Sequence, residues 1–416
     1  MWNIRIASSL KQLIDREIQI RRYSCPSNMK PEWSISATTV RDYLNSKIEE
    51  AGPFQDDWTQ MSDFHTKKLW HQLTLKLESL LKNPEFRIKT DLIQLTNNFL
   101  ADFIYKINPL SLAELCVPIS EQYVVTDPHK GIKFLEEVRD EFTTKSKEAK
   151  ILFNTTIGMI YLSALSDLPN ARQIIETTQN QLDEIEGVTT VHSRFYQLSS
   201  RYYQVTGQHA KFYQEALRFL GCVDLNTLTI EEQRGWAFSV GLAAILGEGV
   251  YNFGELLTHG ILSSLHGSSE AWLVDLLQAF NRGDLNQLDQ LRSRWCIQAD
   301  LVAAEPKLRD KVTLLCLVET VFRRPANNRT LTFAEISAVT RVPVDKVEHF
   351  LMKALSLKLI KGRIDEVNQC VALTWLQPRV LDKEQIASMC ARLNEWSAAV
   401  EGMKSLVEVD TKSILT

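Results

Sequence analysis

The sequence has no pair of cysteines in the C-x-x-C spacing that redox and zinc sites use. Its cysteines are odd in number and widely scattered, which does not fit the disulfide framework of small secreted domains. The seven cysteines are Cys25, Cys116, Cys222, Cys296, Cys316, Cys370 and Cys390. This usage indicates a reducing compartment.

Long hydrophobic runs and a large net charge are also missing. The longest strongly apolar stretch, Trp236 to Leu246, is about half of the roughly 20 residues that a membrane-spanning helix needs. The 47 basic and 51 acidic residues leave a net charge of -4, which is too small to draw the whole chain to nucleic acid or anionic lipid. We therefore expect no membrane segment, and a nucleic-acid role only if a local patch supplies it.

Motifs for catalysis and cofactor binding are absent as well. The eight histidines lack metal-ligand spacings such as H-E-x-x-H. The glycine-rich stretch from Gly247 to Gly254 has Asn252 where a dinucleotide-binding turn needs its third glycine, so it favours close helix packing. Cys222 has no evident neighbouring base and is interpreted as a buried structural cysteine rather than a nucleophile. We expect no catalytic, cofactor-binding or metal-binding residue, and no enzyme.

The composition that is present is that of a soluble globular protein. Of the 416 residues, 44% are hydrophobic and 24% are charged, and the length predicts two or more structural units. Residues 1–55 are interpreted as an atypical N-terminal extension. Its first thirty residues are basic with interspersed apolar positions, but they are short of serine and not free of acids, which disfavours the alternative of a transit peptide.

Residues 56–265 are predicted to form an irregular, tetratricopeptide-like helical-repeat solenoid, which makes the fold mainly α. Apolar residues recur there at three and four positions, although no fixed-period repeat is visible. One predicted helix runs from Asp63 to Lys82 and an antiparallel partner from Glu85 to Ile107. Asp127-Pro128 is typical of an N-cap followed by a first-turn proline. Such a solenoid exposes a long surface suited to binding other proteins.

Residues 266–381 are predicted to form a second module, with a helical hairpin first and a winged helix over about 326–381. Gly283 is expected to end one helix of the hairpin and Asp284 to begin the next.

The winged-helix prediction rests on the order of its signals. A turn over residues 325–328 precedes Thr332-Phe-Ala-Glu335, which has the form of a capping box, and Pro343 begins a second helix. Two strand-like runs then follow, Leu359 to Ile364 and Cys370 to Trp375. Helix, turn, helix and hairpin is the order of a winged helix.

The two strand-like runs also supply candidate partner-binding residues. An exposed strand edge can bind a neighbouring chain through backbone hydrogen bonds. The alternative is that these apolar side chains close the winged-helix core, and both hold if the strand faces alternate. The five candidates are Ile360, Ile364, Val371, Leu373 and Trp375.

The segment 382–416 is predicted to be a long C-terminal helix that joins a bundle. Its apolar residues are spaced alternately three and four apart over three heptads, which is the pattern of a helix that packs against partner helices. The alternative is packing against the chain's own solenoid. The seam consists of Ile386, Met389, Leu393, Trp396, Val400, Met403 and Val407.

A nucleic-acid role for the winged helix remains an alternative. Residues 322–381 carry ten basic and five acidic residues. However, Asp345 and Glu348 lie at the start of the helix that would enter the major groove, and the wing tip Asp365-Glu366 is acidic. Protein docking is therefore the favoured interpretation.

Five longer runs of sequence resemble a known family. A helical-repeat array followed by a winged helix and a terminal helix is similar to the PCI family, found in the proteasome lid, the signalosome and a translation initiation factor. Within it, the runs resemble the family of non-ATPase regulatory subunit thirteen of the proteasome regulatory particle lid, from about residue 60 to the end. The runs are 191–200, 216–224, 247–257, 322–327 and 375–382.

The resemblance implies a non-catalytic structural lid subunit that contributes to ubiquitin-dependent degradation and has no cofactor. It implies a hetero-oligomer in the cytoplasm and nucleus. The implied partners are other PCI lid subunits, the deubiquitylase-containing lid pair and the nearby ubiquitin receptor. The alternatives are a PCI subunit of the signalosome or of the initiation factor.

Overall fold

The computed structural model describes residues 37–50, 52, 54–143, 146–324, 329–380 and 383–415. The chain divides into two compact units, Met1–Ile185 and Glu186–Thr416, and each is described by itself. Residues 1–36 of the expected N-terminal extension and the expected turn at 325–328 lie outside the described residues.

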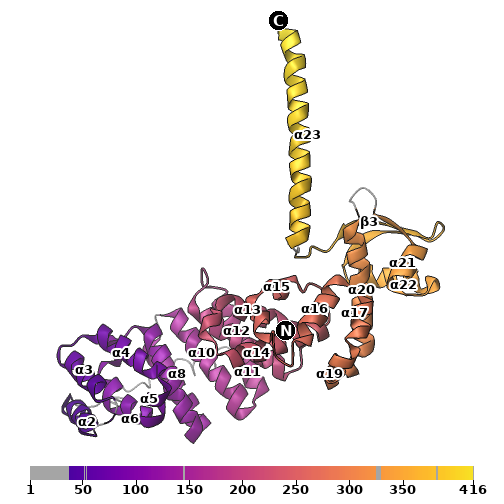
Figure 1. The fold of residues 1–416 in the computed structure, drawn as a ribbon. Coiled ribbons are helices and arrows are strands. Elements are labelled where there is room, and N and C mark those ends of the chain that lie inside the picture. Colours follow the sequence, from indigo (N-terminus) through magenta and orange to yellow (C-terminus); the bar gives the residue numbers. More distant parts are fainter. Residues whose placement is uncertain are drawn as a thin grey trace, which may run out of the picture. The chain divides into compact units, whose positions relative to one another are not determined.

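The first unit is built from packed helices in its described part (Figure 1). Apolar residues at helical spacing bury one face of each helix, so that α8 packs on α9 and α10 on α11. Asp127 caps α9 by accepting the His129 amide, and Pro128 is its first residue, as predicted. The longer helices are α2 (Ala37–Glu49), α3 (Gln55–Thr66), α4 (Trp70–Lys82), α8 (Pro109–Thr126), α9 (Pro128–Phe142), α10 (Lys147–Ile160) and α11 (Leu168–Leu182).

The two helices predicted over 63–82 and 85–107 are not continuous in the structure, and each is divided into shorter elements. α3 ends at Thr66 and α4 begins at Trp70, because Lys68 between them has a left-handed backbone with φ 55°. The second segment is divided because Asp91 caps a new helix after Thr90 adopts an extended conformation. Its pieces are α5 (Pro84–Lys89), α6 (Leu92–Leu95), a π-helix (Thr96–Leu100), α7 (Ala101–Phe103) and a 3-10 turn (Ile104–Lys106).

The second unit begins with further helices around a common core. α13 and α14 contribute Phe212, Phe219 and Trp236 to that core, and α16 contributes Phe280. The helices are α12 (Thr190–Val205), α13 (His209–Cys222), α14 (Ile230–Leu246), α15 (Gly254–Thr258), α16 (Trp272–Arg282), α17 (Leu285–Gln290), α18 (Arg292–Trp295) and α19 (Ala299–Ala303). The hairpin prediction is confirmed, since Gly283 ends α16 with φ 65° and Asp284 caps α17.

A winged helix follows in the same unit. Its elements are α20 (Glu305–Arg323), β1 (Thr330–Thr332), α21 (Phe333–Thr340), α22 (Val344–Ser356), β2 (Ile360–Asp365) and β3 (Cys370–Leu376). The antiparallel sheet has the order β1-β3-β2, and the capping box of Thr332 and Glu335 opens α21. The short strand β1 was not predicted from the sequence. The core contains Val318, Ile336, Leu351 and Val371.

The chain ends in α23 (Lys383–Leu415). Repeated helices, a winged helix and a long terminal helix confirm the predicted fold class. Among the described helices, none combines the length and the apolar character that crossing a membrane requires.

Candidate partner-binding surfaces

The described part of the chain leaves the apolar seam of the terminal helix α23 exposed. Every residue from 386 to 408 is exposed. The seven seam residues are between 51% and 68% exposed, and Trp396 is among the most exposed. If a partner buried one of these side chains fully, the burial would stabilise the complex by roughly 1.5 to 3 kcal/mol. The isolated chain does not gain this free energy.

One further residue widens this seam. Leu406 precedes Val407 and is 68% exposed, although it falls outside the three-four spacing. Heptad geometry places Leu406 beside the seam. The sequence pattern alone does not include it, and its exposure in the structure is what makes it accessible to a partner. The seven seam residues share one face by their spacing. That they bind a partner stays a prediction.

The winged-helix sheet places the five strand candidates differently from one another. Ile360, Val371 and Leu373 are buried in the core, Ile364 is half-buried against it, and Trp375 is 37% exposed. The core-forming alternative therefore describes the first three side chains.

Within the described sheet, β2 lies at an edge and β3 lies in the centre. β3 pairs with β2 along its length and with β1 through Cys370, Val371 and Ala372. The Leu373 amide also donates to the Arg329 carbonyl. The backbone at Val371 and Leu373 is therefore paired within the chain, whereas Ile360 and Ile364 lie on the edge strand β2. That any of the five candidates binds a partner stays a prediction.

A bulge interrupts β2 at Lys361 and Gly362. A side chain at Gly362 would collide with the backbone of Ala372, so the close approach of the strands requires glycine there. Lys361 lies over the Trp375 ring, with 4.7 Å between its Nζ and the ring centroid. This cation–π contact holds Trp375 at the surface of the wing.

Apolar side chains on the helical side of the winged helix were not anticipated as surface residues. On α22, Val344 is 43% exposed and Met352 is 48% exposed. The spacing of apolar residues that predicts a buried helix face does not show which turns of that face are covered by neighbouring elements.

Ion pairs within the chain engage much of the positive charge of the winged helix. Of the ten basic residues counted over 322–381, five form ion pairs with carboxylates of the same unit. Lys353, for example, contacts Asp310 at 2.8 Å. The five are Arg323, Arg324, Arg341, Lys353 and Arg379. The excess that suggested a phosphate-binding surface is therefore partly neutralised.

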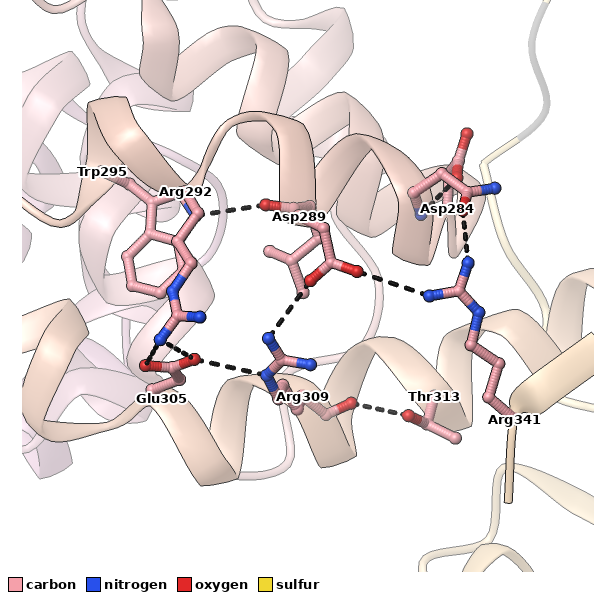
Figure 2. A network of polar contacts seen from close by, with 10 residues as sticks. Asp284, Asp289, Arg292, Trp295, Glu305, Arg309, Thr313 and Arg341 are labelled. Carbon is pink, nitrogen blue, oxygen red and sulfur yellow. Dashed lines mark hydrogen bonds and ion pairs between the residues drawn. The ribbon is translucent and has the colours of Figure 1, made fainter. Parts of the chain in front are cut away.

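A chain of ion pairs joins the helical hairpin to the winged helix (Figure 2). Glu305 accepts from Arg292 at 2.9 Å and from Arg309 at 3.3 Å. Asp289 then links Arg309, at 3.1 Å, to Arg341 at 3.4 Å. The arginines and Asp289 are exposed and Glu305 is half-buried, so each pair contributes little alone, but the chain of pairs orients α17, α18 and the end of α21 on α20.

A buried lysine fastens the same helix, α20, to the end of α14. The Lys311 ammonium donates to the carbonyl oxygens of Ala244 at 2.8 Å, Ile245 at 2.9 Å and Gly247 at 2.9 Å. Carbonyls at a helix C-terminus lack partners within the helix, so the lysine acts as a cap supplied from another element. Burial lowers the pKa of Lys311 to about 7.

The described residues hold no group of three or more histidine, cysteine, aspartate or glutamate side chains placed to bind a metal ion. Cys222 is half-buried rather than buried, and burial raises the pKa of its thiol. A nucleophilic cysteine requires the opposite shift, because the thiolate is the reactive form.

Family models match three consecutive parts of the chain. The PSD13 N-terminal repeats match residues 57–277, the PCI domain matches 286–375, and the Rpn9 C-terminal helix matches 379–409. The three models follow the order of the observed repeats, winged helix and α23.

Three similar proteins come from different eukaryotes. The 26S proteasome non-ATPase regulatory subunit 13 of Dictyostelium discoideum is 35% identical over 90% of this chain and 98% of its own length. Homolog B of the same subunit from Arabidopsis thaliana is 38% identical over the same shares. The probable 26S proteasome regulatory subunit rpn9 of Schizosaccharomyces pombe is 33% identical over 93% of this chain and its full length.

Proposed function

The chain belongs to the family of the 26S proteasome non-ATPase regulatory subunit 13, and from that premise we propose that it is a structural subunit of the proteasome regulatory particle lid. Its role is to hold other subunits together and so to support ubiquitin-dependent degradation. The observation that carries this proposal is the exposed seam of α23. Exposing these apolar side chains to water is unfavourable, and packing against partner helices removes that cost.

The proposed contacts are of two kinds. α23 would enter a bundle with the terminal helices of other PCI lid subunits, and the winged helix would lie beside a neighbouring winged helix through the edge of β2. The deubiquitylase-containing pair and the ubiquitin receptor are proposed as further partners. We place a further contact, outside the bundle, on the first unit, because stacked helical repeats generally offer a long surface to binding partners.

The proposed subunit performs no chemistry of its own. The raised pKa of the Cys222 thiol and the backbone role of the Lys311 ammonium support this proposal. We propose a location in the cytoplasm and nucleus, where the proteasome works.

Purification of the tagged full-length chain from cell extract, followed by mass spectrometry, tests the proposal. We expect proteasome lid subunits together with proteasomal ATPases. Recovery of signalosome or initiation-factor subunits without proteasomal ATPases would reject it. Duplex DNA binding that weakens steeply with salt would instead favour the winged-helix alternative.

A further inference from the structure

The short segment between the winged helix and the terminal helix is held to the body of the second unit at several points. The Gln377 amide donates to the Leu359 carbonyl at 2.9 Å. Arg379 follows two residues later and lies on α16 and α20. We call residues Gln377–Val380 the strap.

Arg379 makes the principal polar contacts of the strap. Its side chain is 9% exposed, and its Nη1 lies 2.9 Å from Oε2 of Glu319, itself 12% exposed. Its Nη2 donates to the backbone carbonyl and, at 3.1 Å, to the side-chain oxygen of Asn281. A guanidinium bound at two places with so little water around it is held far more firmly than an exposed ion pair.

Val380 packs against Gly254, which has no side chain. A Cβ added at Gly254 would lie 2.9 Å from the Val380 Cγ2 atom and closer still to its Cβ. Gly254 is buried at the start of α15, so its missing side chain is what makes room for the strap. Polar contacts on one side and close packing on the other thus fix Arg379 and Val380.

We propose that the strap is an anchoring device that shortens the tether between the winged helix and α23, so that the two partner contacts act as one bivalent attachment. Without the strap, six residues (377–382) separate β3 from α23, and with it only residues 381 and 382 remain. The reach of the tether falls from roughly 20 Å to roughly 7 Å. This inference rests on the proposed function, because it assumes that both surfaces bind within one assembly.

The gain follows from effective concentration. Once one of two linked surfaces has bound, the other binds at a local concentration that falls roughly as the −3/2 power of tether length. A threefold longer tether lowers that concentration about fivefold. Releasing the strap therefore raises about fivefold the protein concentration needed for half-maximal incorporation into the lid, while α23 itself is unchanged.

Two unrelated variants of the full-length chain release the strap. Gly254→Ala removes the space for Val380, and Arg379→Met removes the polar contacts. The controls are Gly235→Ala, at an exposed glycine with open space around it, and Arg323→Met, which removes the exposed partner of the same Glu319. Circular dichroism and thermal unfolding establish that each variant folds, and either strap variant alone suffices for the test.

Release is measured without reference to partners. Trypsin should cut the Arg379–Val380 bond several-fold faster in Gly254→Ala than in wild type, and the Gln377 amide should exchange faster in Arg379→Met. Incorporation is then titrated with the remaining lid subunits, and the strap variants should require about five times more protein than wild type and the controls.

The outcomes separate the two proposals. If Gly254→Ala is cut no faster than wild type and the Gln377 amide of Arg379→Met exchanges no faster, or if a released strap leaves the incorporation midpoint unchanged, the anchoring role is overturned. The double variant Leu393→Asp/Trp396→Asp tests the proposed function, because it destroys the seam and leaves the strap intact. Unchanged incorporation of that variant would overturn the bundle itself.

Discussion

At the scale of single residues, the buried Lys311 links α20 to the end of α14 in the second unit. Its three carbonyl contacts come from residues 64 to 67 positions earlier in the chain. In the sequence it is one of several basic residues of a helix and nothing distinguishes it from exposed Lys307. The capping role could not be predicted, because only the tertiary structure brings the end of α14 to α20.

Replacing Lys311 by methionine should destabilise the second unit by roughly 2 to 4 kcal/mol at pH 7, because buried carbonyl acceptors lose their donor. The measurement is the urea midpoint of the full-length chain. Lys307→Met is the matched control, since the pair that it breaks with Glu248 is exposed. A Lys311→Met midpoint equal to that of the control would show that the carbonyls do not depend on this lysine.

The same residue predicts a dependence on pH. The pKa of Lys311 is lowered to about 7 by burial in the folded chain, whereas an unfolded lysine titrates near pH 10.4. Between these values the unfolded state binds more protons, so the pH-dependent part of the stability that Lys311 confers grows as pH rises from about 7 towards 10.4 and is lost as pH falls back to about 7.

We therefore expect the stability difference between wild type and Lys311→Met to grow by about 2 kcal/mol from pH 7 to pH 9. Comparing the two proteins removes other titrating groups, such as the Cys116 thiol, whose pKa burial raises to about 12 and whose effect has the opposite sign. A difference that stays constant with pH would contradict an altered Lys311 pKa.

At the scale of elements, local signals predicted many ends and failed inside long segments. The caps at Asp127 and Asp284 and the capping box at Thr332 depend on neighbouring residues alone, so the sequence contains all that is needed. The break at Lys68 and the π-helix after Leu95 carry no such signal, because packing against other helices selects these conformations. The strand β1 is three residues long and forms only by pairing with β3.

Two glycines with similar backbones allow a comparison of helix ends. Gly207 has φ 70° and open space around it, whereas a side chain at Gly283 would lie 2.5 Å from the Cα and N atoms of Cys316. Gly207→Ala should cost about 1 kcal/mol for the left-handed backbone alone. Gly283→Ala should cost at least about 2 kcal/mol more, because α16 and α20 must separate. Urea unfolding of the two variants measures the difference, and equal losses would exclude close packing as the reason for Gly283.

At the scale of the whole molecule, the order of modules was predictable and the placement of surfaces was not. Hydrophobic periodicity predicted the helical array and α23, and the order of the turn, caps and strand-like runs predicted the winged helix, because each of these patterns lies within the module's own sequence. The seam of α23 could be identified for the same reason. The strands were harder to interpret, since alternation does not reveal that β3 is central and β2 is at the edge.

The domain limits 1–55, 56–265, 266–381 and 382–416 stay predictions, and so do the partner contacts of the twelve site residues. Family models cover 57–277, 286–375 and 379–409, and the structure divides the chain after Ile185. The sequence of one chain does not specify its contacts with other chains, because half of each interface belongs to the partner.

The central claim is that partner helices cover the seam of α23. Leu393→Asp/Trp396→Asp places two charges in that seam, whereas Ala391→Asp/Ala398→Asp places two charges on the opposite face of the same exposed helix. Losing two buried apolar residues costs roughly 3 to 6 kcal/mol, which corresponds to at least a hundredfold weaker association. The most direct measurement is co-sedimentation of each full-length variant with the proteasome from cell extract. We predict that the seam variant leaves the particle while the opposite-face variant remains in it, and a seam variant that still sediments with the intact particle would contradict the account.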